Sequence, residues 1–136
     1  MKQSIPMSGS KVLLDTNIVI ELFKGNPSVT ASLERHQFVS IPFAVLGELY
    51  LGAYRSSNPI KHIKQVHDFL RKCDVLIADE ETANNYALIK TALLNKGKPI
   101  PENDIWIAAI AKQYELSLIT RDKHFNEIDG LSTENW

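Results

Sequence analysis

Four acidic side chains stand where a folded chain could bring them together. Asp15 comes directly after a short apolar run, and Asp122 follows the end of another expected strand, after Thr120 and Arg121. Asp104 lies at an expected helix start, and Glu48 lies within an apolar helix. Carboxylates that share a pocket repel one another and burial raises their pKa values, so they stay ionised only around a cation. Mg²⁺ and Mn²⁺ prefer such oxygen ligands and leave positions open for water and a phosphate. The pattern predicts a divalent-metal site.

Each acid also has a simpler structural interpretation. Asp15 could only cap the helix after it, although Thr16 and Asn17 favour that role too. Asp104 could only complement the dipole of its first helical turn, but the neighbouring Asn103 already suits the cap. Asp122 could be an ordinary turn residue. The metal site therefore depends on the four acids together.

Glu48 is the most informative of the four because of its helical neighbours. The residues three and four positions away are Ala44, Val45, Leu51 and Gly52. This stripe is expected to be buried, and a buried acid needs partners. Glu21, with polar neighbours at the same spacing, is interpreted as a solvated surface acid.

The elements that position the acids alternate between short apolar strands and helices. We expect strands at residues 12–14, 38–41, 75–78 and 117–120, and a last short one near 131–133. Helices are expected at 17–24, 27–35, 43–55, 59–72, 80–96 and 104–115. This alternation is typical of an α/β fold with a mostly parallel sheet covered on both faces. Such sheets bind ligands at the carboxyl ends of their strands, where Asp15 and Asp122 lie.

Size and composition limit the possible classes. With 136 residues, of which 44% are hydrophobic, the chain fits one domain, expected at 11–136 after a flexible leader at 1–10. No apolar run approaches the roughly 20 residues of a membrane helix. The net charge of −1 gives no global field toward nucleic acid, so any such binding must be local. A single cysteine, Cys73, excludes an internal disulfide framework and suits a reducing cytoplasm.

Other polar residues have more than one interpretation. The Thr120 hydroxyl lies beside the expected site and could orient a metal-bound water, although threonine is common in strands. The four histidines have no spacing that puts two on one helical face, so no zinc site is expected. The basic residues of the helix at 59–72 could grip phosphates, but a solvated face is the default. Gly47 and Gly52 suggest close packing of their helix, including packing against a second chain.

Four blocks of the sequence together resemble a PIN-domain ribonuclease, and more narrowly the VapC toxins of bacterial toxin–antitoxin pairs. The blocks are LLDTN at 13–17, Glu48, IPENDIWIAA at 100–109 after Gly97, and LITRDKHF at 118–125. The resemblance covers about 11–133, and its strength lies in the series and not in any single block. Two features depart from the family: ten residues precede the first strand, and His124 stands where many relatives carry another acid.

The resemblance implies a PIN-like three-layer α/β/α sandwich with a central, mostly parallel sheet of four or five strands. It implies hydrolysis of RNA phosphodiester bonds by a quartet that holds Mg²⁺ or Mn²⁺, with a catalytic threonine beside it. Carried over, the quartet is Asp15, Glu48, Asp104 and Asp122, and the hydroxyl residue is Thr120. The implied partners are an RNA substrate, a small VapB-like antitoxin and a second copy in a homodimer, all in the cytoplasm.

Three alternatives remain from the residues and the resemblance. One is a PIN nuclease outside toxin–antitoxin systems, and another is a catalytically silent PIN domain that only binds. Receiver-type phosphoacceptors and haloacid-dehalogenase-type phosphatases also use an acidic strand edge. They need further acids near the first strand, where this chain has Thr16 and Asn17.

Overall fold

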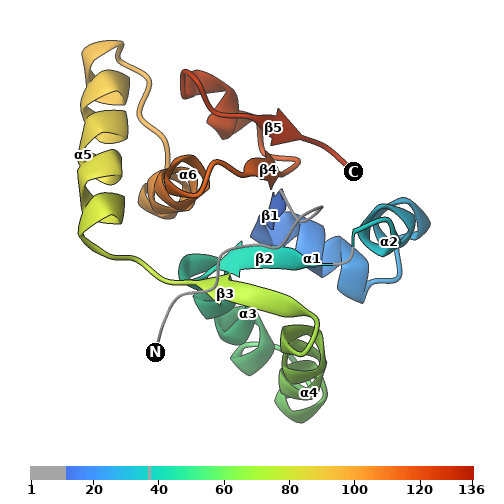
Figure 1. Cartoon of the computed structure of the whole chain (residues 1–136). Helices are drawn as coiled ribbons and strands as arrows, with labels where there is room; N and C mark the ends of the chain where they lie inside the picture. Colours follow the sequence, from blue (N-terminus) through green and yellow to red (C-terminus); the bar gives the residue numbers. More distant parts are fainter. Residues whose placement is uncertain (1–11, 37) are drawn as a thin grey trace.

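The computed structural model describes residues 12–36 and 38–136 and has an α/β architecture (Figure 1). The expected leader at 1–10 lies outside the described residues. The strands are β1 (Val12–Leu14), β2 (Val39–Pro42), β3 (Cys73–Leu76), β4 (Ser117–Ile119) and β5 (Thr133–Glu134). The α-helices are α1 (Thr16–Phe23), α2 (Pro27–Glu34), α3 (Phe43–Tyr54), α4 (Pro59–Leu70), α5 (Glu80–Asn95) and α6 (Glu102–Gln113). A short 3₁₀ helix, η1 (Lys123–Glu127), follows β4.

The five strands form one parallel sheet in the order β3-β2-β1-β4-β5. The central strands are buried on both faces; Leu13, Leu14, Leu118 and Ile119 are each at most 1% exposed. A parallel strand with both faces covered reads as a continuous apolar run, which is why these short segments were recognisable. The structure confirms the predicted three-layer α/β/α class and gives the sheet five strands.

The strand order reverses beside β1. From β1 the chain adds β2 and then β3 on one side, and later adds β4 and β5 on the other side. Leu13 of β1 is paired with Ser40 of β2 and with Leu118 of β4. In open parallel sheets ligands bind outside the carboxyl ends of the strands at such a reversal. The residues that follow β1 and β4 therefore occupy the favoured position for a site.

Several predicted boundaries differ from the structure by one or two residues, and two of them are informative. The third strand is Cys73–Leu76, two residues earlier than expected, because Val39 of β2 pairs with Cys73 and the chain then turns into the cap of α5 at Asp79. Asn103 does not cap α6, since the helix begins at Glu102 after Pro101. The Pro101 carbonyl accepts the amide hydrogen of Asp104 at 3.0 Å, so Asp104 stays in the first turn as predicted.

The helices pack in neighbouring pairs. The two late helices α5 and α6 lie against each other, and α3 lies against α4 and α1 (Figure 1). The α6 segment 107–111 is completely buried and anchors its helix on the sheet. No helix of the described residues is long and apolar enough to cross a membrane.

Candidate active site

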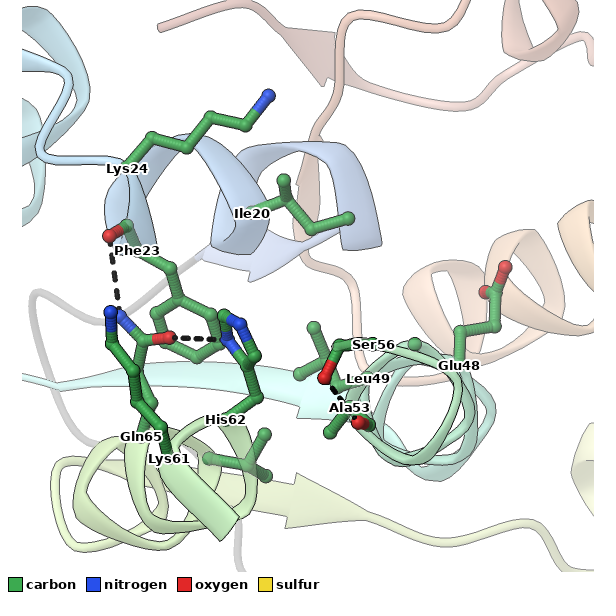
Figure 2. Close-up of a pocket in the computed structure, with 12 residues that line it drawn as sticks. Ile20, Phe23, Lys24, Glu48, Leu49, Ala53, Ser56, Lys61, His62 and Gln65 are labelled. Carbon is green, nitrogen blue, oxygen red and sulfur yellow. Dashed lines mark hydrogen bonds between the residues drawn. The ribbon is translucent and has the colours of Figure 1, made fainter. Parts of the chain in front are cut away.

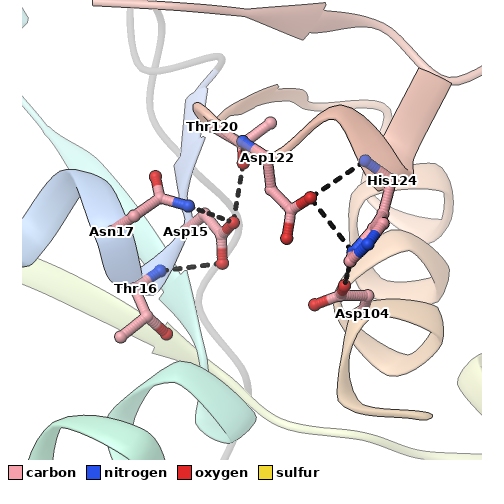
Figure 3. Close-up of polar contacts among 7 residues, drawn as sticks. All are labelled: Asp15, Thr16, Asn17, Asp104, Thr120, Asp122 and His124. Atoms are coloured by element: carbon pink, nitrogen blue, oxygen red, sulfur yellow. Dashed lines mark hydrogen bonds and ion pairs between the residues drawn. The ribbon is translucent and has the colours of Figure 1, made fainter. Parts of the chain in front are cut away.

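Asp15 is held at the end of β1 by donors on three sides. Its Oδ1 accepts the Thr16 amide at 2.8 Å, and its Oδ2 accepts from Asn17 Nδ2 at 3.1 Å and from Thr120 Oγ1 at 2.7 Å (Figure 3). The residue is 4% exposed. Asp15 does cap α1, and the same carboxylate faces the end of β4. Capping and a place in the site are thus compatible and were not true alternatives.

Thr120 links the two strand ends. Its hydroxyl donates its one hydrogen to Asp15 and accepts the amide of Asp122 at 3.0 Å. The side chain is buried, with 6% of the residue exposed. Because the only hydroxyl hydrogen is used on Asp15, Thr120 positions Asp15 relative to Asp122; donation to a water would break that bond.

Asn17 is a second link that the sequence interpretation missed. Its Nδ2 donates to Asp15, and its Oδ1 accepts the Arg121 amide at 3.1 Å. The start of α1 and the loop after β4 are therefore tied together twice, through Asn17 and through Thr120. The signal in the sequence was the run of three polar residues after β1, which exceeds what one helix cap requires.

Asp104, Asp122 and His124 form the tightest group in the site. One ligand atom from each lies within 4.8 Å of the others. His124 Nδ1 is 3.2 Å from Asp104 Oδ2 and 3.1 Å from Asp122 Oδ1, and Figure 3 shows both contacts. Asp104 comes from the first turn of α6, while the other two begin η1, which packs on α6. Sequence spacing could not reveal this group, because Asp104 comes from a different element than Asp122 and His124.

Glu48 lies farther from this group. Its Oε1 accepts the Thr16 hydroxyl at 2.9 Å, which connects it to the residue after Asp15. The expectation that Glu48 projects from a buried stripe was wrong in part: Val45 is buried, but Leu51 is 57% exposed and Gly52 is also exposed. α3 covers the core with Val45, Leu49 and Ala53, and Glu48 itself is half-buried at the rim of the site.

Burial and mutual repulsion raise the pKa values of three acids. For Asp15 burial is the main cause, and Asp122 adds repulsion that is opposed by the hydrogen bond from Thr120. Burial likewise raises the pKa of Glu48, with a further contribution from Asp15. Burial, together with repulsion from Asp122 and Asp15, raises the pKa of Asp104 to about 6, while His124 opposes the rise. The charges of these acids therefore influence one another across the site.

The donor set fits a divalent cation of the magnesium class. Its acids offer carboxylate oxygens, which hard cations prefer, and a cation would lower the raised pKa values of Asp15, Glu48 and Asp104. Among the described residues no lysine or arginine forms an ion pair with Asp15, Glu48, Asp104 or Asp122. The negative charge is consequently left largely unbalanced in the protein alone.

Glu21 also differs from its interpretation as a solvated surface acid. It accepts from Asn26 Nδ2 at 3.0 Å and lies 3.7 Å from Arg121 Nη1. Its side chain is 26% exposed, and the bond from Asn26 is the main factor that lowers its pKa. Glu21 therefore helps to hold the loop after β4 and belongs to the surroundings of the site.

A groove lies beside the site between α1, α3 and α4 (Figure 2). Its cavity has a volume of about 320 Å³ and an apolar floor that includes Phe23, Leu49 and Val66. Lys61 and His62 of the basic helix α4 line one side. Glu48 is at its other end, with its carboxylate pointing away from the other labelled side chains. The groove thus runs from a basic helix to the rim of the acidic site.

Comparisons with known proteins cover nearly the whole chain. The model of the family described as PIN domain matches residues 12–131, which include all four acids. Ribonuclease VapC2 of Haemophilus influenzae is 36% identical over 129 residues, covering 93% of this chain and 98% of the relative. The tRNA(fMet)-specific endonuclease VapC of Shigella flexneri is 33% identical over the same shares. The structure of VapBC2 from Rickettsia felis bound to a DNA fragment from its promoter matches with a TM-score of 0.87 and 28% identity, over 92% of this chain and 98% of that one.

Proposed function

The chain belongs to the PIN-domain family, and we propose that it is a metal-dependent endoribonuclease that acts as the toxin of a toxin–antitoxin pair in the cytoplasm. The observation that carries the proposal is the meeting of acids from separate parts of the chain at the strand-order reversal. Relatives named ribonuclease and endonuclease support the reaction class.

Asp15, Asp104 and Asp122 would hold the metal, with Glu48 at the rim of the same site. A bound Mg²⁺ or Mn²⁺ lowers the pKa of a water and neutralises charge that develops on phosphate oxygens during hydrolysis. Thr120 is assigned a positioning role, because its hydroxyl fixes Asp15 relative to Asp122. Thr16 is also assigned a positioning role, because its hydroxyl donates to the Glu48 carboxylate.

The first test is RNA cleavage by the wild type and by Asp15→Asn. We expect cleavage of a structured RNA in Mg²⁺ or Mn²⁺, and loss of most turnover in the variant and in EDTA, because asparagine lacks the ligand charge. Initiator transfer RNA is the first substrate to use, since the Shigella relative is named for it. Asp129→Asn is the control, because Asp129 is 95% exposed beyond the site. Wild-type activity that persists unchanged in EDTA would overturn the proposal.

The antitoxin is proposed to bind the groove between α1, α3 and α4. The groove is apolar, leads to the acidic site and lies in a chain whose structural neighbours include a VapBC complex. A segment that carries an arginine would fit at the end near Glu48, because a guanidinium pairs bidentately with carboxylates. Such a segment would compete with metal and stop cleavage.

Growth provides the test of the partner. Expression of this chain alone is expected to arrest growth, and co-expression with the small protein encoded beside it should restore growth. Ile20→Asp, which puts a charge at an exposed apolar residue that lines the groove, should weaken the rescue without charging the core. Isolation of the tagged chain from its own host without a stoichiometric small partner would contradict the pairing.

We also propose a homodimer. Gly47 and Gly52 have no heavy atom of the described residues within 4 Å of an added Cβ, so residues 12–36 and 38–136 do not supply the close packing expected of them. On the same helix, Leu51 and Tyr54 are 57% and 67% exposed. A second copy would cover such an apolar face. Light scattering of the purified protein gives its molecular mass and therefore distinguishes a monomer from a dimer.

The two alternative functions have less support. A silent binding domain has no need for acids from separate elements that meet, partly buried, at one edge of the sheet. A nuclease outside toxin–antitoxin systems would share the site, and the growth experiment separates it from the toxin.

A further inference from the structure

His124 adds a nitrogen donor to a site that otherwise offers oxygen. We propose that His124 is itself a ligand of the divalent ion and that it shifts the preference of the site from Mg²⁺ toward Mn²⁺. The inference rests on the proposed metal-dependent function and specifies one member of the ligand set. It is carried by the contacts of the imidazole with Asp104 and Asp122.

The distances from His124 Nδ1 to the two carboxylate oxygens suit neighbouring ligands on one ion. Ligands at about 2.1 Å from an octahedral ion lie roughly 3.0 Å apart when they are adjacent. His124 Nδ1 lies 3.2 Å from Asp104 Oδ2 and 3.1 Å from Asp122 Oδ1. With Nδ1 as the ligand atom, the neutral ring carries its one hydrogen on Nε2.

The backbone under His124 is fixed while its ring is free to adjust. The His124 amide donates to Asp122 Oδ1 at 2.9 Å, and the next residue, Phe125, is 1% exposed in the core. The imidazole side chain is 52% exposed. A small rotation toward an ion would therefore displace no packed neighbour.

A nitrogen ligand changes the choice of metal. Mg²⁺ takes oxygen ligands almost exclusively, whereas imidazole suits the first-row transition metals. With His124 in place Mn²⁺ gains a good donor, and Mg²⁺ gains little. An aspartate at the same position would return the site to oxygen ligands alone.

The competing role for His124 is that of a counter-charge that leaves when metal arrives. Removal of such a counter-charge would make the pocket more negative and would strengthen the binding of both ions. Removal of a ligand weakens Mn²⁺ far more than Mg²⁺. The two roles therefore predict opposite changes in affinity.

The test uses the purified full chain loaded with Mn²⁺. Pulsed electron paramagnetic resonance reports ¹⁴N coupled to bound Mn²⁺, and calorimetry gives the affinities for Mn²⁺ and Mg²⁺. The variants are His124→Ala and His124→Asp. His62→Ala, which removes an imidazole on α4, is the matched control. Melting temperatures verify that each variant is folded.

We expect ¹⁴N coupling in the wild type and in His62→Ala, and none in either His124 variant. Mn²⁺ affinity should fall about 10- to 100-fold in His124→Ala. His124→Asp should keep metal binding and lose part of the preference for Mn²⁺. Bound Mn²⁺ without ¹⁴N coupling, or coupling that survives in His124→Ala, would overturn this inference and leave the proposed function intact. Failure of the wild type to bind either ion would overturn both.

Discussion

Asp104 is predicted to destabilise the metal-free protein through its own charge, so Asp104→Asn should raise stability. Burial and the neighbouring acids raise its pKa from the usual 3.8 to about 6. This difference in pKa lowers the free energy of unfolding by about 3 kcal/mol at neutral pH. The side chain is only 15% exposed, so solvent screening reduces this figure little. For a domain of this size we expect a rise in Tm of roughly 5 to 10 °C.

The stabilisation should depend on pH with a defined sign. A carboxyl group whose pKa is raised by folding contributes most stability below its unfolded pKa, and this contribution is lost as the pH rises through about 6. The advantage of asparagine should therefore be complete near pH 7.5 and shrink to about 1 kcal/mol at pH 4.5. Thermal melts of both proteins in EDTA at the two pH values measure this difference.

Asp68→Asn is the matched control. Asp68 is an exposed acid on α4 whose pKa is lowered, chiefly by the hydrogen bond from Lys64 at 3.0 Å. Its replacement should leave the Tm at pH 7.5 unchanged or slightly lower, opposite to Asp104→Asn. A lower Tm for Asp104→Asn at pH 7.5, or a gain of equal size at pH 4.5, would refute the reasoning from crowded charge.

Three further outcomes are expected. Mn²⁺ should raise the wild-type Tm, by the equivalent of about 2.7 kcal/mol at a hundredfold excess over Kd. Asp104→Asn should lose most of this rise in Tm. An unchanged wild-type Tm would contradict the metal site. Thr120→Val should weaken Mn²⁺ binding about 10- to 100-fold in calorimetry because Asp15 loses its donor, while Thr120→Ser should bind normally. Thr16→Val should slow RNA cleavage because Glu48 is released, and Thr16→Ser should restore it; equal rates for both would argue against this role.

The place of the site could be predicted from the sequence because it depends on strand ends. Asp15 and Asp122 each follow an apolar run, and parallel strands bring their carboxyl ends to one edge. Asp104 was recognised from the start of a helix. Its place in the first turn was predicted correctly, although the helix begins two residues earlier than expected. These inferences need only the local direction of the chain.

The remainder of the site depends on packing that periodicity does not contain. The environment of Glu48 was mispredicted because an apolar stripe on α3 was assumed to face the core, whereas Leu51 lies in solvent. His124 lies in a 3₁₀ turn and meets Asp104 only because η1 packs on α6. Hydrogen-bond partners such as Asn17 are set by side-chain directions at the strand ends and have no signature in spacing.

The burial and repulsion that destabilise the charged acids of the free protein should strengthen their affinity for metal. Neutral donors from Thr16, Asn17 and Thr120 fix the carboxylates in place without cancelling their charge. The roughly 3 kcal/mol of destabilisation at Asp104 disappears when a cation neutralises the pocket, and that energy corresponds to about a hundredfold in Kd. Stability without metal and affinity for metal should consequently change in opposite directions across substitutions of the acids. A set of single Asp→Asn and Glu→Gln variants, each measured by melting in EDTA and by Mn²⁺ calorimetry, tests this relation. Variants that gain stability and keep their full affinity would show that the cation does not bind among these charges.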